Sequence, residues 1–171
     1  MTFKNFIFVF IAVVILPACK NPSFPTVPIV DVDRFTGTWY EIASLPTTYN
    51  KDCSCSKIVM SLEKQDCIHM VSSCMRENSE IKSELKAVIQ EGSGNAKMRV
   101  QMFWPFRTNY YVIALGPDYE YTMVCNPDKT SLQILSRQKF LDSPVYDELI
   151  AKAESLGFES ALIVKISQTC D

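Results

Sequence analysis

Seven cysteines and one histidine are the residues of this 171-residue chain with the greatest capacity for chemistry. A structural zinc site would need Cys/His clusters such as repeated C-x₂-C pairs. The chain instead carries a C-x-C at Cys53 and Cys55, and its single histidine is His69. This spacing argues against a metal site. So many cysteines favour an oxidising compartment, in which disulfides form.

A thiol could also attack a bound molecule if its pKa were lowered and a base lay beside it. The candidate is Cys67 or Cys74, activated by His69. Their orientation depends on strand register, because a shift of one residue turns every side chain to the other face. The residues on either side of His69 are more apolar than the histidine, so we expect His69 on the outer face. A thiol enzyme stays open as an alternative function.

The first residues have the composition of a secretory signal. Lys4 precedes an apolar run over residues 6–16, and small residues lead to Cys19. The run is too short to span a bilayer, which takes about 20 apolar residues. We therefore expect residues 1–18 to be removed as a signal peptide. The ending resembles the bacterial lipoprotein signal, which implies that Cys19 is acylated and becomes the new N-terminus, with plain secretion as the alternative.

The remaining length suits one domain. Prolines at 22, 25 and 28 predict a stiff spacer over residues 19–30, followed by a folded domain over 31–171. The formal net charge is −2, with acids and bases interspersed. No basic run is present, so the sequence does not favour a nucleic-acid partner.

Apolar and polar residues alternate through most of the domain, which predicts strands with one buried face. The turn-forming stretches lie at residues 91–95, 116–118 and 126–129. They separate about eight runs, which predicts an all-β fold, an eight-stranded antiparallel up-and-down barrel. The runs cover residues 39–45, 57–62, 67–75, 81–89, 97–104, 110–115, 119–125 and 132–137.

One C-terminal helix is expected to pack outside the barrel. Ser143 is the expected N-cap, Pro144 occupies the first position, and Gly157 follows the end. Apolar residues recur on one face of this segment at helical spacing. A last apolar run over residues 162–166 could add an edge strand.

An eight-stranded barrel is just wide enough to be filled by side chains or to hold one small ligand. Its expected inward residues are mostly apolar, with methionines and tyrosines, and this composition suits an acyl chain with a polar head. Glu41 shares the inward side and would need hydrogen-bond partners. The inward positions are Ile58, Met60, Leu62, Ile81, Leu85, Ile89, Val100, Met102 and Trp104, and on later strands Tyr110, Val112, Tyr121 and Met123.

Three motifs occur in the order found in the lipocalin family. Gly37-x-Trp39 resembles the family's opening motif, Asp118-Tyr119 is similar to its Thr-Asp-Tyr turn, and the segment 134–137 resembles the end of its eighth strand, with Arg137. The resemblance covers residues 31–167 and extends to the bacterial outer-membrane lipocalins, apolipoprotein D and the plant temperature-induced lipocalins. It implies that Gly37, Trp39 and Arg137 close one end of the barrel, with Arg137 over the indole.

The resemblance also implies a function and one disulfide. The function is binding of a fatty acid or lysophospholipid by a lipid-anchored protein of the outer membrane that faces the periplasm. Neither a cofactor nor a catalytic residue is implied, and a homodimer is left open. Cys55 matches a position that pairs with a C-terminal cysteine in apolipoprotein D, which implies Cys55–Cys170. We pair Cys53 with Cys74 as a guess and leave Cys125 free. A structural lipoprotein with a filled barrel is a further alternative.

Overall fold

The computed structural model describes residues 24–103 and 105–170. The expected signal peptide, Cys19 and Trp104 lie outside the described residues, as does the side chain of Met102. Within these described residues, nine strands and two helices follow one another, with a 3₁₀ turn before the last strand. Their bounds are α1 Val32–Phe35, β1 Gly37–Ser44, β2 Ser54–Lys64, β3 Cys67–Arg76, β4 Ser79–Ile89, β5 Lys97–Phe103, β6 Phe106–Leu115, β7 Tyr121–Cys125, β8 Leu132–Ser136, α2 Ser143–Ser155, η1 Ser160–Leu162 and β9 Val164–Lys165.

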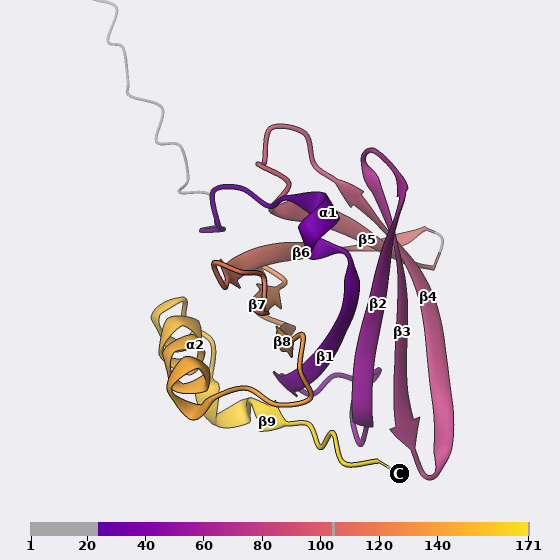
Figure 1. Cartoon of the computed structure of the whole chain (residues 1–171), viewed down its shortest axis with the longest axis vertical. Coiled ribbons are helices and arrows are strands. Elements are labelled where there is room, and N and C mark those ends of the chain that lie inside the picture. Colours follow the sequence, from indigo (N-terminus) through magenta and orange to yellow (C-terminus); the bar gives the residue numbers. More distant parts are fainter. Residues whose placement is uncertain (1–23, 104, 171) are drawn as a thin grey trace, which may run out of the picture.

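The first eight strands close into a barrel, as the sequence predicts. Each strand pairs antiparallel with its successor, and β1 pairs with both β8 and β2, which joins the two ends of the sheet. The strands wrap around a common interior in Figure 1. The short strand β9 pairs with β1 at Ala43 and Ser44, so the expected C-terminal edge strand is confirmed.

The barrel interior is packed solidly at the end nearest α1. Trp39 and Phe35 are fully buried there, with ring centroids 5.6 Å apart, and the Trp39 indole donates to the Phe35 carbonyl over 2.8 Å. Gly37 opens β1 with φ +95°, a conformation that L side chains rarely adopt. A Cβ at this glycine would lie 3.2 Å from the Arg137 guanidinium, so close packing also favours glycine.

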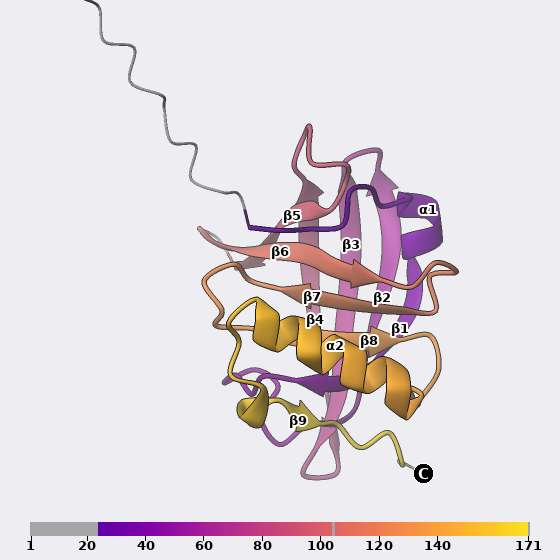
Figure 2. The same cartoon turned by 90° about the vertical axis from the view of Figure 1, so that its left-hand side faces the viewer.

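Helix α2 covers the outside of the barrel along β7 and β8, as Figure 2 shows. Leu149 and Ala153 are buried in an apolar layer against these strands. The helix begins one residue earlier than expected, since Asp142 rather than Ser143 is its N-cap residue. Gly157 follows the C-cap with φ +80°, as the sequence predicts for a glycine ending a helix.

Residues 24–30 differ from the predicted spacer because they pack on the barrel. The Val27 amide donates to the Val112 carbonyl over 3.0 Å, and the Val30 amide donates to the Gly94 carbonyl over 2.7 Å. Val30 is fully buried, and the Phe24 ring lies 6.4 Å from the Tyr111 ring. The prolines keep this segment extended, and its apolar side chains find burial sites along β6. Within residues 24–103 and 105–170, no helix has the length and apolar character needed to cross a bilayer.

Candidate functional site

The buried Trp39 and Phe35 rings close one end of the barrel and form its floor, which we call the Trp39 floor. A cavity of about 680 Å³ occupies the barrel beyond this floor. One wall comes from β2 to β5, where apolar side chains alternate with small polar ones. The apolar ones are Ile58, Met70, Ile81, Leu85 and Val100, and the serines are Ser56, Ser72, Ser73 and Ser83. Cross-strand pairing aligns its residues, because Ile58 lies opposite Ser72, Ser72 opposite Ser83, and Met70 opposite Leu85. Side chains of directly opposed residues share one face of a sheet. The volume falls within the range of small-molecule pockets, about 300–1,000 Å³.

The opposite wall is polar and centres on Glu41 of β1. This side chain is 1% exposed. Its carboxylate accepts hydrogen bonds from the Ser56 hydroxyl, from the Gln133 amide over 3.1 Å and from the Asn50 amide over 3.4 Å. Buried carboxylates need such donors to offset the loss of water. This is the hydrogen-bonding role expected for Glu41.

Tyr110 of β6 faces the same cavity. Its hydroxyl oxygen is buried and has no hydrogen-bond partner among the described residues. Burial, and secondarily the negative charge of Glu41, raises the pKa of Tyr110 above its ordinary value. The phenol therefore stays protonated and offers an unused donor to whatever enters the cavity.

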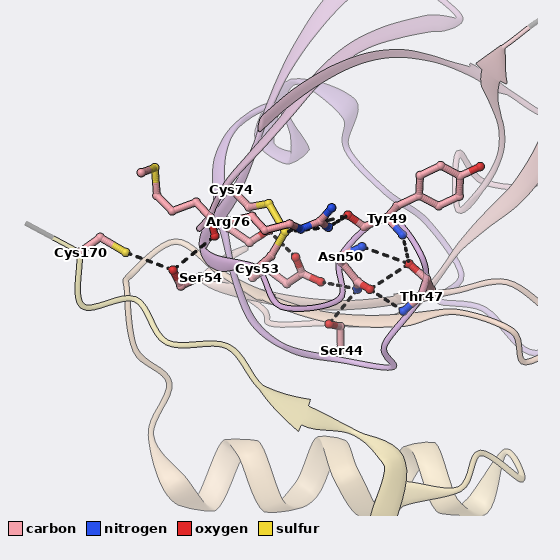
Figure 3. Close-up of a disulfide and its surroundings, with 12 residues drawn as sticks. Ser44, Thr47, Tyr49, Asn50, Cys53, Ser54, Cys74, Arg76 and Cys170 are labelled. Atoms are coloured by element: carbon pink, nitrogen blue, oxygen red, sulfur yellow. Dashed lines mark hydrogen bonds between the residues drawn. A yellow bond between two sulfur atoms is a disulfide. The ribbon is translucent and has the colours of Figure 1, made fainter. Parts of the chain in front are cut away.

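The loop between β1 and β2 contributes Thr47, Tyr49, Asn50 and Cys53 to the cavity lining, at the mouth opposite the closed end, and is fastened at several points (Figure 3). The Asn50 side chain donates to the Ser44 hydroxyl over 3.0 Å, and its carbonyl oxygen accepts from the Thr47 amide over 2.6 Å. A disulfide joins Cys53 to Cys74 on β3. The Arg76 guanidinium donates to the Tyr49 carbonyl over 2.8 Å. The loop is thus tied to the rim of the barrel on both sides.

Arg137 seals the opposite, closed end. Its guanidinium carbon lies 3.7 Å from the centroid of the Trp39 ring. The same guanidinium donates to three backbone carbonyls: Thr38 over 2.9 Å, Arg34 over 2.6 Å and Tyr119 over 3.2 Å. Burial lowers the pKa of Arg137 from its ordinary value. The predicted position of Arg137 over the indole is confirmed.

Tyr119 connects the turn before β7 to the N-terminal segment. Its hydroxyl accepts from the Asp31 amide over 2.8 Å, and the Arg34 guanidinium lies 4.2 Å from its ring centroid. Its backbone φ is +61°. Asp118, beside it, is exposed in the turn. Both motif residues therefore lie at the closed end, away from the cavity.

The structure brings together five of the predicted ligand-binding residues and places five others elsewhere; Trp104 and the side chain of Met102 lie outside the described residues. Met60 and Val112 are buried in the closed-end core beside Trp39. The cavity residues among the predictions are Glu41, Ile58, Leu85, Val100 and Tyr110. Ile81, which the alternation also places inward, lines the cavity as well.

The expected inward positions of Tyr121 and Met123 are wrong. Met123 is fully buried in the layer under α2, on the outside of the barrel, and Tyr121 packs against the same layer. The inward residues of β7 are Thr122 and Val124, which pair with inward residues of β8 and β6. Both faces of β7 are apolar because α2 covers the outer one, so alternation does not identify the inner face.

Leu62 also does not line the cavity. It lies opposite Ile68 and so keeps the inward side of β2, but it is 43% exposed. The Gly37–Met60 pair marks the last residues that β1 and β2 share, and Leu62 lies beyond it. The sequence therefore predicts the correct face of β2 for Leu62, but not its position along the barrel axis.

Sequence reasoning missed most of the polar wall. The Asn126 amide donates to the Thr108 hydroxyl over 2.8 Å, and Gln133 reaches Glu41 across 92 positions of sequence. The one available signal was on β8, where Gln133 interrupts an apolar run at the position that alternates with the inward Leu135.

The cysteines form two disulfides, Cys53–Cys74 and Cys55–Cys170, the two pairs expected. The free thiols in the described part of the chain are Cys67 and Cys125, and neither lines the cavity. Burial raises the pKa of Cys125 to about 12 and, together with Glu63, also raises the pKa of Cys67.

His69 lies on the outer face, as expected. Its imidazole is 3.5 Å from the Glu84 carboxylate, and its strand neighbours Ile68 and Met70 are the buried residues. A thiol enzyme would need a cavity thiol of lowered pKa with a base beside it. Neither Cys67 nor Cys125 meets that requirement, and Cys74 is in a disulfide.

Comparisons with known proteins agree with this geometry. The family described as a lipocalin-like domain matches residues 30–168. The chain is 31% identical to the outer membrane lipoprotein Blc of Citrobacter freundii, covering 92% of each protein. It is 26% identical to temperature-induced lipocalin-1 of Arabidopsis thaliana, covering 82% of this chain and 80% of that protein.

A solved structure supports the same fold. Lobster apocrustacyanin A1 superposes with a TM-score of 0.68 at 14% identity, covering 88% of this chain and 94% of that one. The closed eight-stranded barrel, the tryptophan floor under Arg137 and the match over residues 30–168 lead to one conclusion. This chain belongs to the lipocalin family.

Proposed function

We propose that this chain binds one single-chain lipid, a fatty acid or a lysophospholipid, in the barrel cavity and stores or transports it in the cell envelope. Lipocalins bind small hydrophobic molecules. The observation that carries the proposal is the cavity of about 680 Å³ above a sealed floor, with apolar side chains of β2 to β5 in its lining. A structural protein with a filled barrel has no need of such a space, because protein interiors are close-packed.

The test is lipid capture by the full-length protein. Native mass spectrometry of protein released from bacterial membranes with a mild detergent is expected to show a lipid adduct. Ser72→Phe points a ring into the cavity from β3 and is expected to abolish the adduct. Ser61→Phe adds the same ring on the exposed face of β2 and is the matched control, expected to retain it.

A second measurement separates binding from a filled barrel. A fluorescent fatty acid is expected to bind saturably to the wild type and to Ser61→Phe, and not to Ser72→Phe. Equal, unsaturable signals in all three proteins would contradict the binding function.

We further propose that Cys19 anchors the protein in the outer membrane on its periplasmic side. The support is the lipoprotein-like signal and the relatives described as outer membrane lipoproteins. Cys19→Ser is expected to move the protein from the membrane fraction to the soluble fraction on an immunoblot. Retention in the membrane after this change would contradict the anchor.

A further inference from the structure

The charge of the cavity wall is negative. Among the described residues that line the cavity, none is lysine, arginine or histidine. Glu41 points into the interior, whereas Glu84, which also borders the cavity, turns its carboxylate to His69 on the outer face. Arg76 is not among the lining residues, and its guanidinium donates to the Tyr49 carbonyl in the loop between β1 and β2. No described cation therefore faces Glu41 from the cavity lining.

Every hydrogen bond to the Glu41 carboxylate comes from a donor. All three partners, Ser56, Gln133 and Asn50, donate to it through O–H or N–H groups. A carboxylate only accepts, so this set of donors satisfies the charged form. A second negative charge beside the buried Glu41 carboxylate would be repelled, because Coulomb interactions with a buried group are stronger than those in water.

Tyr110 supplies the second observation. Its buried hydroxyl has no partner among the described residues, and Tyr110 and Glu41 line the same cavity. A buried hydroxyl without a partner is costly, so a bound group that bonds to it is favoured. A ligand hydroxyl or amine could interact with Tyr110 and donate to the remaining acceptor sites of Glu41.

We propose that Glu41 and Tyr110 form a head-group site that selects a neutral or cationic hydrogen-bond donor, such as a hydroxyl or an amine, and discriminates against a carboxylate. This inference rests on the proposed lipid-binding function and narrows the ligand class. Long-chain alcohols, monoacylglycerols and amines fit the site, and a lysolipid fits through its hydroxyl or ammonium group. A free fatty acid fits poorly.

The test compares ligands that differ only in the head. A fluorescent long-chain alcohol is displaced from the full-length protein at pH 8 by hexadecanol, hexadecylamine or palmitate. The alcohol and the amine are expected to bind at least about tenfold more tightly than the acid. This comparison in the wild type needs no variant to fold.

Two matched variants then locate the effect. Glu41→Gln keeps the size of the side chain and removes its charge, and is expected to bring the acid within about threefold of the alcohol. Glu80→Gln makes the same change on the exposed outer face of β4, at a residue that does not line the cavity, and is expected to preserve the wild-type ratio.

Three results would overturn the inference. The first is palmitate binding as tightly as hexadecanol in the wild type. The second is an acid-to-alcohol ratio that folded Glu41→Gln leaves unchanged. The third is a loss of palmitate affinity in Arg76→Ala that exceeds the loss of hexadecanol affinity. That result would place the palmitate carboxylate beside Arg76 at the cavity mouth and not beside Glu41. Failure of all three competitors to displace a saturably bound probe would overturn the proposed lipid specificity itself.

Discussion

The guanidinium carbon of Arg137 lies 3.7 Å from the centroid of the Trp39 ring, while its nitrogens donate to carbonyls of three separate segments. This one side chain joins the N-terminal helix, the first strand and the turn before β7. Arg137→Ala is therefore expected to lower the free energy of unfolding by about 3 kcal/mol. The melting temperature should fall by roughly 6–12 °C.

The readout for Arg137 combines thermal unfolding with a binding titration. Ligand affinity at a temperature where the variant is folded is expected to match the wild type, because the cavity lies beyond the Trp39 floor. Arg99→Ala, on an exposed position of β5, is the control. An unchanged melting temperature with altered ligand preference would contradict the structural role of Arg137.

Met70 and Met123 form a matched pair of buried methionines on opposite sides of the barrel wall. Met70 lines the cavity, and Met123 packs under α2. Both alanine variants are expected to be destabilised, Met123→Ala by about 2–4 kcal/mol and Met70→Ala by less, because it borders open space. Only Met70→Ala should change ligand affinity. A change in affinity with Met123→Ala alone would reverse the assignment of the two faces.

The two disulfides close loops of very different length. Cys55–Cys170 spans 115 positions and Cys53–Cys74 spans 21. On chain-entropy grounds the first should stabilise by about 4–5 kcal/mol and the second by about 3 kcal/mol. Denaturant unfolding of the double serine variants checks this order. Equal losses, or a larger loss for the shorter loop, would contradict it.

Removing Cys53–Cys74 also has a local consequence. The loop between β1 and β2 loses its covalent tie at the cavity mouth, and the remaining hydrogen bonds hold it less firmly. Ligand association and dissociation should both accelerate in the Cys53→Ser/Cys74→Ser variant. The Cys55→Ser/Cys170→Ser variant leaves the mouth intact, so its exchange rates should match the wild type.

Cys125 gives a pH-dependent prediction. Its pKa is raised from 9.0 to about 12 in the folded protein. Between these values the unfolded chain loses the thiol proton and the folded chain keeps it, so the unfolded state is favoured as the pH rises. Stability should therefore fall from about pH 9 to 12, and Cys125→Ala should weaken this fall.

Thiol labelling provides the matching measurement. At pH 8 native protein is expected to react with iodoacetamide at Cys67, which is partly exposed, and not at Cys125. Cys67→Ser should abolish this reaction, and unfolding without reductant should expose Cys125. Rapid native labelling of Cys125 would contradict its burial under α2.

The strands of the barrel were predictable because most of them have one apolar face and one polar face. This holds best for β2 to β5, whose outer face is open to water, and there Ile58, Leu85 and Val100 lie where alternation places them. The alternation does not identify the inner face of β7. Helix α2 covers the outer face of this strand, so the outer residue Met123 is apolar like an inner one.

The polar wall was not predictable for a different reason. Thr108 and Asn126 carry no signal of an inward side chain, and only the closed barrel brings Gln133 to Glu41 and Asn126 to Thr108. A pattern of period two shows which face of a strand a residue occupies, but not how far along the barrel axis the residue lies. Leu62 was therefore predicted to line the cavity although it is exposed.

Both ends of the described chain are tied down. Near residue 24 the backbone is bonded to β6, and near residue 170 Gln168 bridges the carbonyls of Glu41 and Ser56 beside the last disulfide. Proteases usually begin at frayed termini. Digestion that starts at either of these ends must then wait for the barrel to open, so the resistance of the domain to proteases that attack its ends should follow its stability.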